Sequence, residues 1–184
     1  MILYSVTTIL GKYNDFSMIP PEVLEAAAAR GTEVHDYCAN YALGIWTPPL
    51  PAHLEGYGLS FRRWFDEYVI EVILVEKLLK DEVMGFKGKI DLIPKLKGDF
   101  HPSIIDYKTP ITTGPTWEAQ IAAYKRLAVQ NGIPVERGGD LKLKRDGAPA
   151  KYIPCSNSIQ AFAAFHHALN AHRYFKGDPR KEAT

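Results

Sequence analysis

Strand-like segments stand on both sides of an amphipathic helical segment, and this order restricts the chain to a small group of folds. In the helical segment, residues 115–130, apolar side chains recur every three or four positions. Asn131-Gly132, which follows it, favours the end of the helix at residue 130. Strands are predicted at residues 71–79, 84–93, 103–108, 142–145 and 151–154, and further helices at residues 21–43, 53–68 and 158–174. Strands, a helix and further strands predict an α/β fold with a mixed central sheet flanked by helices.

The length and composition are typical of one domain. With 184 residues, of which 46% are hydrophobic, the chain can bury a sizeable core, and we predict a single domain over residues 1–175 and a frayed charged tail over residues 176–184. A net charge of +1 argues against a protein that coats nucleic acid indiscriminately. Cys38 and Cys155 form no C-x-x-C pair and are predicted to be reduced thiols. Without an apolar leader or a stretch of membrane length, the chain is expected to be soluble and cytoplasmic.

The segment Asp106-Tyr107-Lys108 ends a predicted strand with an acid and a base on one face. Side chains alternate along a strand, so Asp106 and Lys108 project together and Tyr107 projects to the other side. The same alternation divides the preceding strand into two faces, with Lys89, Asp91 and Ile93 on one and Ile90 and Leu92 on the other. A hairpin turn at residues 97–99, which contains a glycine, would bring Asp91 beside Asp106.

Two carboxylates and one ammonium suit the hydrolysis of a phosphodiester. Carboxylate oxygens are typical ligands of Mg²⁺ and Mn²⁺. A bound ion would act as a Lewis acid, and a nearby lysine would orient a water or stabilise negative charge. Asp91, Asp106 and Lys108 are the candidates for these roles. The alternative is an exposed hairpin in which Asp106 and Lys108 form an ordinary ion pair, worth about 0–1 kcal/mol.

Three further polar side chains stand in apolar surroundings. Gln120 falls on the inward stripe of the helix at residues 115–130, where a buried amide needs hydrogen-bond partners from a wet cleft or from the core. His35 shares the small-residue face of the helix at residues 21–43 and is either a satisfied core group or a ligand. Glu76 ends a β-branched run and either faces a partner or marks the point where the strand reaches solvent.

A basic pattern follows the helix at residues 115–130. Lys142 and Lys144 alternate with Leu141 and Leu143, so one face of a strand would carry positive charge while the other packs inward. That charge suits a phosphate backbone, but an ordinary solvated strand has the same pattern.

The motifs, taken in order, resemble those of the PD-(D/E)XK nuclease superfamily, and within it the RecB-type exonuclease domains. The segments that carry the resemblance are Ser5-Val6-Thr7-Thr8-Ile9-Leu10, Arg30-Gly31-Thr32-Glu33-Val34-His35, Gly88-Lys89-Ile90-Asp91, Ile105-Asp106-Tyr107-Lys108-Thr109 and Gln120-Ile121-Ala122-Ala123-Tyr124. They cover most of the chain. One departure is Ile90, which stands where the superfamily name has proline.

The resemblance implies a restriction-endonuclease-like fold and a role for each motif. It implies that the metal is held by His35, Asp91, Asp106 and the backbone carbonyl of Tyr107, and that Lys108 positions the attacking water. It also implies that Gln120 and Tyr124 line the cleft and that Glu76 is an outer acid. An imidazole ligand would shift the preference toward Mn²⁺. The chain lacks the four cysteines of the relatives that hold an iron–sulfur cluster, so we expect no such cluster.

The function predicted from the sequence is that of a Mg²⁺- or Mn²⁺-dependent DNA exonuclease. It would act on DNA ends or single strands in recombination, repair or phage DNA processing, alongside recombination or replication proteins. Two alternatives stay open. One is an inactive nuclease-fold subunit that binds nucleic acid or serves in assembly, and the other is a DNA endonuclease.

Overall fold

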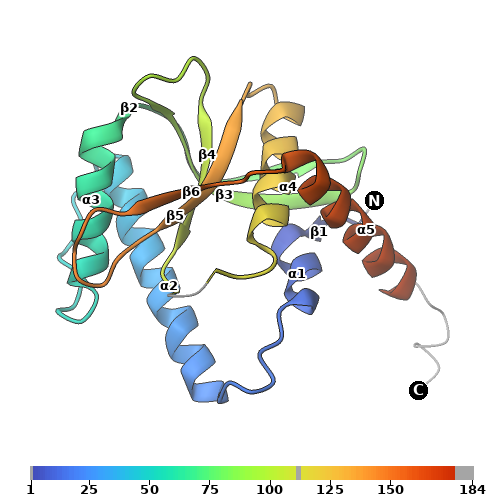
Figure 1. Ribbon diagram of the computed structural model, residues 1–184, viewed down its shortest axis with the longest axis horizontal. Coiled ribbons are helices and arrows are strands. Elements are labelled where there is room, and N and C mark those ends of the chain that lie inside the picture. The colour runs from blue at the N-terminus through green and yellow to red at the C-terminus, as the bar shows by residue number, and fades with distance from the viewer. Residues whose placement is uncertain (1, 111–112, 177–184) are drawn as a thin grey trace.

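The computed structural model describes residues 2–110 and 113–176, and it is α/β. Within these residues a six-stranded mixed sheet is flanked by helices, as predicted (Figure 1). The elements in chain order are β1 (Tyr4–Ser5), α1 (Val6–Leu10), the short 3₁₀ helix η1 (Gly11–Tyr13), α2 (Pro21–Ala42), α3 (Glu55–Tyr68), β2 (Val69–Asp81), β3 (Phe86–Leu96), β4 (Ser103–Lys108), α4 (Trp117–Gln130), β5 (Arg137–Lys142), β6 (Lys151–Pro154) and α5 (Ser158–Lys176). Of the predicted tail, residue 176 ends α5, and residues 177–184 lie outside the described residues.

The sheet has the strand order β1-β3-β4-β5-β6, with β2 paired to β3. The pairs β1–β3 and β4–β5 are parallel, and the other pairs are antiparallel. Strands β3 and β4 form the predicted antiparallel hairpin, and Gly98 in its turn has a φ of +85°, which favours glycine. The end of β4 therefore lies near the middle of the sheet.

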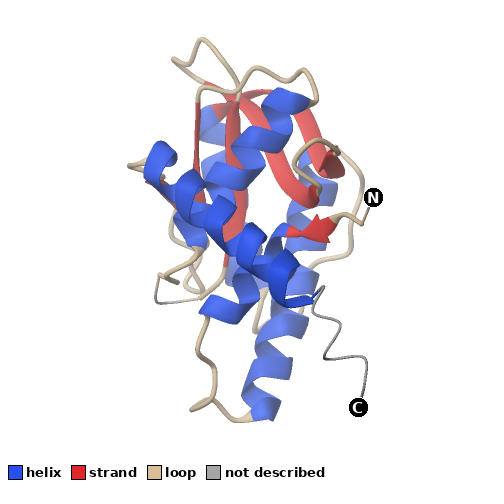
Figure 2. Ribbon diagram, turned by 90° about the vertical axis from the view of Figure 1, so that its right-hand side faces the viewer, coloured by secondary structure: helices blue, strands red, loops and turns tan. Residues whose placement is uncertain are grey.

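Helices cover both faces of the sheet and bury two separate cores. On one face α2 and α3 pack over Leu92, Ile105 and Tyr107 (Figure 1). On the other face α1, α4 and α5 pack over Ile90 and Ile104, and α5 crosses in front of α4 in Figure 2. Because residues 105 and 107 alternate with residue 104, strand β4 supplies side chains to both cores.

Strand β5 lies earlier in the chain than its predicted position at residues 142–145, and that prediction was wrong. Arg137-Gly138-Gly139-Asp140 reads as a turn, yet it forms most of β5, beside β4. The glycines reflect close packing. A Cβ atom at Gly138 would lie 2.8 Å from Cγ2 of Ile121, and one at Gly139 would lie 2.3 Å from the carbonyl oxygen of Ile153. Small residues were needed here, so the usual strand signal is missing.

Three further observations concern the leucines after β4, the cysteines and the hydropathy of the helices. Leu141 and Leu143 are buried, as the alternation predicted. Cys38 and Cys155 are free thiols. None of the helices in the described part of the chain combines the length and the hydropathy that spanning a bilayer requires.

Candidate metal centre

A cavity of about 470 Å³ opens beside the last residues of β4. Strands β3 and β4 are paired at Leu92 opposite Ile105, and the cavity lies beside the residues that follow Ile105 on β4. Side chains from α2, β2, β3, β4 and α4 line this cavity. They include all seven side chains that were predicted as candidates, namely His35, Glu76, Asp91, Asp106, Lys108, Gln120 and Tyr124. The structure therefore brings together residues that are as much as 89 positions apart, from His35 to Tyr124.

Asp91 fills the gap between the two strands. One of its carboxylate oxygens, Oδ2, accepts a hydrogen bond of 2.8 Å from the backbone N–H of Tyr107, where a paired strand would offer a carbonyl. The alternation predicted for this strand was wrong at this point, because Ile90 and Ile93 pack into the same core while Leu92 packs into the other. This break in the alternation places the Asp91 carboxylate beside the end of β4.

His35 reaches the same place from α2. Its Nε2 donates a hydrogen bond of 3.0 Å to the carbonyl oxygen of Tyr107, and its Nδ1 lies 3.3 Å from Oδ2 of Asp91. Burial by itself lowers the pKa of His35, but the charge and hydrogen bond of Asp91, with the charges of Asp106 and Glu76, outweigh burial and raise the pKa to about 9. Without a metal ion the ring therefore carries a proton on both nitrogens near neutral pH.

Glu76 enters the cavity from β2 through a distorted backbone. It lies between the paired positions of Val75 with Leu92 and of Lys77 with Ile90, which places it opposite Asp91. Its φ of +48° lies in the left-handed region, which a glutamate rarely adopts and which costs about 1–3 kcal/mol. Strain that is held by flanking strand pairs is typical of functional positions.

The side chain of Glu76 is half-buried, and in the residues that the structure describes only one of its two carboxylate oxygens has a partner. Its Oε2 forms an ion pair with Lys89, whereas its Oε1 has no hydrogen-bond partner among the described residues. Burial raises the pKa of Glu76, and Lys89 opposes that rise. A buried acceptor without a donor is costly, so this oxygen is suited to binding a cation.

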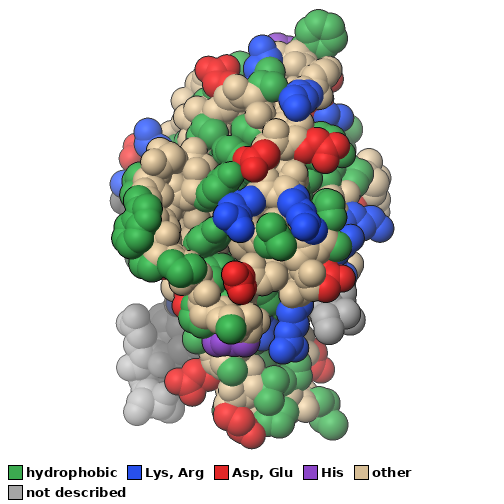
Figure 3. All heavy atoms as spheres, turned by 90° about the vertical axis from the view of Figure 1, so that its left-hand side faces the viewer, with side chains coloured by type: hydrophobic (Ala, Val, Ile, Leu, Met, Phe, Trp, Pro, Cys, Tyr) green, Lys and Arg blue, Asp and Glu red, His purple; other side chains and the backbone are tan. Residues whose placement is uncertain are grey.

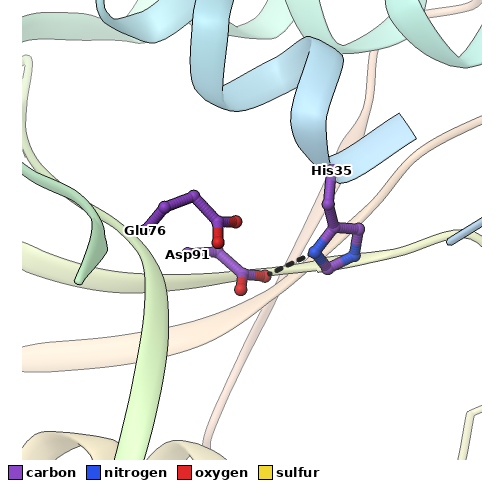
Figure 4. Close-up of side chains that lie close together, drawn as sticks. All are labelled: His35, Glu76 and Asp91. Atoms are coloured by element: carbon purple, nitrogen blue, oxygen red, sulfur yellow. Dashed lines mark ion pairs between the residues drawn. The ribbon is translucent and has the colours of Figure 1, made fainter. Parts of the chain in front are cut away.

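His35, Glu76 and Asp91 together form a group of potential metal ligands. One ligand atom from each lies within 4.8 Å of the others, and Figure 4 shows the three side chains converging from α2, β2 and β3. Two carboxylates and an imidazole match the donors that Mg²⁺ and Mn²⁺ accept, and imidazole tilts the choice toward Mn²⁺. The unpaired Oε1 of Glu76 supports this fit.

Asp106 and Lys108 occupy the neighbouring part of the cavity. They share a face of β4, as predicted, and form a buried ion pair, not an exposed one. The Asp106 carboxylate contacts Lys108 and Gln120. The group of potential metal ligands therefore contains Glu76 as its third member, and Asp106 lies beside that group. Burial lowers the pKa of Lys108, but Asp106 outweighs burial and raises that pKa, so the ammonium stays charged.

Gln120 holds this neighbouring part together. Its Oε1 accepts a hydrogen bond of 2.9 Å from Lys108 Nζ, and its Nε2 donates to Asp106 Oδ1 at 2.9 Å and to the Tyr124 hydroxyl at 3.1 Å. The Tyr124 ring packs over Gly88, where a Cβ atom would lie 2.6 Å from Cε1 of the ring. Glycine at residue 88 therefore makes room for Tyr124, and the amide of Gln120 is satisfied by the cleft.

One residue of the site was missed from the sequence. Asp140 is buried on β5 opposite Asp106 and lies 3.8 Å from Lys108 Nζ through its Oδ1. Burial raises the pKa of Asp140 to about 7, although Lys108 lowers it. Its only sequence signal was its position after two glycines, and that pattern indicates a turn.

The raised pKa of His35 predicts that the metal-free protein loses stability as pH increases. The folded state binds the His35 proton up to about pH 9, whereas an ordinary histidine releases it near pH 6.5. The stabilisation is therefore complete below about pH 6.5 and disappears as pH rises through about 9, at a cost on the order of 3 kcal/mol. Urea unfolding in EDTA would measure the loss. His35→Gln should remove the dependence in this window, and an unchanged slope in that variant would contradict the prediction.

Comparison with known proteins gives no family assignment. No protein-family model matches the chain, and no curated protein matches it.

Proposed function

We propose that the chain is a divalent-metal-dependent DNA exonuclease that hydrolyses phosphodiester bonds from DNA ends. The observation that carries the proposal is the meeting of a metal-ligand group, His35, Glu76 and Asp91, with the charged Lys108 in one cavity. A structural ion pair would need neither the unpaired Glu76 oxygen nor the strained backbone beneath it.

His35, Glu76 and Asp91 would hold Mg²⁺ or Mn²⁺, with the carbonyl oxygen of Tyr107 and the carboxylate of Asp106 close by. When bound, such an ion would supply Lewis acidity toward a phosphate and acidify a water. Binding would require His35 to release the proton that it shares with Asp91, so affinity would increase with pH. The chain has two cysteines, and the proposed cofactor is therefore a divalent ion without an iron–sulfur cluster.

The remaining residues would orient the reaction. Lys108 keeps its proton and is fixed by Gln120 and Asp106, so its ammonium can hold an attacking water in line or stabilise negative charge on the phosphate. Tyr124 fixes Gln120 in turn through their hydrogen bond. Such fixed polar groups lower a barrier because they need no reorganisation as charge develops.

The choice of an exonuclease over an endonuclease rests on the resemblance of the motifs to RecB-type domains. The same resemblance supports roles in recombination, repair or phage DNA processing, with DNA as substrate and recombination or replication proteins as partners. An inactive binding subunit would retain the cavity without turnover.

One digestion experiment tests the proposal. Linear DNA labelled at its ends and closed circular DNA, each single- and double-stranded, are incubated with Mn²⁺, Mg²⁺ or EDTA. We expect ion-dependent release of label from linear DNA and intact circles. Cleavage of the circles would replace the exonuclease with an endonuclease. No cleavage of any substrate with either ion would remove the enzymatic proposal.

A further inference from the structure

A second cavity, of about 620 Å³, adjoins the metal centre. The two cavities share Thr109 and Pro110, which follow β4 directly, so the cavities lie side by side. Arg30, Lys142, Lys144 and Arg145 contribute cations to the second cavity, and Asp146 contributes the single carboxylate among the residues that line it. In a chain with a net charge of +1, this is a local concentration of positive charge.

The basic wall of this cavity is anchored by contacts with β4 and α3. The backbone N–H of Leu143 donates to the carbonyl oxygen of Lys108 at 2.8 Å, and that of Lys144 donates to Ser60 Oγ at 2.9 Å. Arg63 donates a hydrogen bond of 2.7 Å to the carbonyl oxygen of Gly147. The segment also packs so closely on α3 that a Cβ atom at Gly56 would lie 1.8 Å from the carbonyl oxygen of Arg145. Residues 143–147 therefore form a fixed platform, which follows directly after β5.

The charge on this platform is available to a ligand. Lys144 and Arg145 are exposed, and Nε of Arg30 is buried without a hydrogen-bond partner among the described residues. Figure 3 shows the face of the molecule on which α3 lies, and basic and acidic side chains are intermixed there. The second cavity is lined by several cationic side chains and lies beside the proposed site of phosphodiester cleavage. It therefore suits a polyanion with regularly spaced phosphates.

The geometry points to a groove that binds the phosphate backbone of single-stranded DNA next to the metal centre, with Lys144 and Arg145 as its main contacts. This inference rests on the proposed function, because the bound strand is taken to lead into a centre that cleaves DNA. The cavity has the size of an ordinary ligand pocket, so it takes in nucleotides of one strand and not a duplex. Thr109 and Pro110 line both cavities, so the groove lies next to the proposed position of the scissile phosphate.

Binding of a short fluorescein-labelled oligothymidylate, measured by anisotropy in EDTA at several salt concentrations, tests the groove without cleavage. Lys144→Ala/Arg145→Ala should weaken binding and make the plot of log K against log salt shallower by about 1.4, because each lost phosphate contact on single strands removes about 0.7 from the slope. The control is Lys97→Ala/Lys151→Ala, which removes the same charge from exposed lysines of another cavity, of about 450 Å³, beside Trp64 and Tyr68. The control should retain the wild-type slope.

The outcomes separate this inference from the proposed function. Equal slopes in the two double variants, or no measurable binding by the wild type, would overturn the groove even if the wild type degrades DNA. A shallower slope in Lys144→Ala/Arg145→Ala alone would support the groove even if no ion supports cleavage. Circular dichroism melting of both variants should match the wild type, since all four replaced side chains are exposed.

Discussion

Replacing Lys108 with methionine is expected to lower the rate of phosphodiester cleavage by about 10²–10³-fold, the usual cost of removing one group that stabilises transition-state charge. The ammonium is held by Gln120 Oε1 at 2.9 Å and by Asp106, and it stays charged despite burial. Methionine keeps the length and apolar character of the lysine stem but removes the charge. Release of end label from linear DNA with Mn²⁺ measures the rate. Lys97→Met, which alters an exposed lysine on the β3–β4 turn, is the matched control and should cleave normally.

The same replacement also breaks a buried ion pair, and stability must be measured with activity. Removing one partner of a buried pair costs on the order of 3–5 kcal/mol, because the other charge is left uncompensated. A melting curve therefore accompanies each assay. If Lys108→Met does not fold, Lys108→Gln replaces it, since its amide can still donate to Asp106 while carrying no charge. Wild-type cleavage by a folded, neutral variant at residue 108 would contradict the role given to Lys108.

The hairpin and the end of β4 could be predicted from the sequence because both depend on local rules. The bounds of β4 are those predicted, since an apolar run followed by Asp106-Tyr107-Lys108 alternates cleanly. The antiparallel pairing of β3 with β4 follows from the glycine turn between them. These two features put Asp91, Asp106 and Lys108 close together.

The details of the metal-ligand group could not be predicted in the same way. Alternation assumes a regular strand, but next to the paired residue Leu92 the Asp91 side chain, and not a backbone carbonyl, accepts the N–H of Tyr107. The positive φ of Glu76 has no local signal, because only the surrounding strand pairs impose it. Asp140 was missed because two glycines that make room for neighbouring strands and α4 resemble a turn. Tertiary packing decides all three.

Asp91→Asn is expected to abolish the stabilisation that a divalent ion gives to the folded protein. A ligand present at about 100 times its Kd stabilises the folded state by about 2.7 kcal/mol, so the wild type should melt at a higher temperature in Mn²⁺ than in EDTA. Asparagine keeps an oxygen that can accept the N–H of Tyr107, so the gap between β3 and β4 stays filled. It removes the charge that faces His35 and Glu76.

Differential scanning fluorimetry across a Mn²⁺ titration, with isothermal titration calorimetry for affinity, measures this change. Loss of a residue that only orients a metal ligand typically lowers metal affinity by about 10–100-fold. We expect the affinity of Asp91→Asn for Mn²⁺ to fall by more than this, because Asp91 is a ligand itself. The control is Glu33→Gln, which removes an exposed carboxylate two residues before His35 on α2 and should bind Mn²⁺ as the wild type does. Because Asp91 contacts both His35 and the end of β4, it is the residue on which the group depends most. Unchanged Mn²⁺ affinity and stoichiometry in Asp91→Asn would place the ion elsewhere and leave His35, Glu76 and Asp91 as a structural cluster.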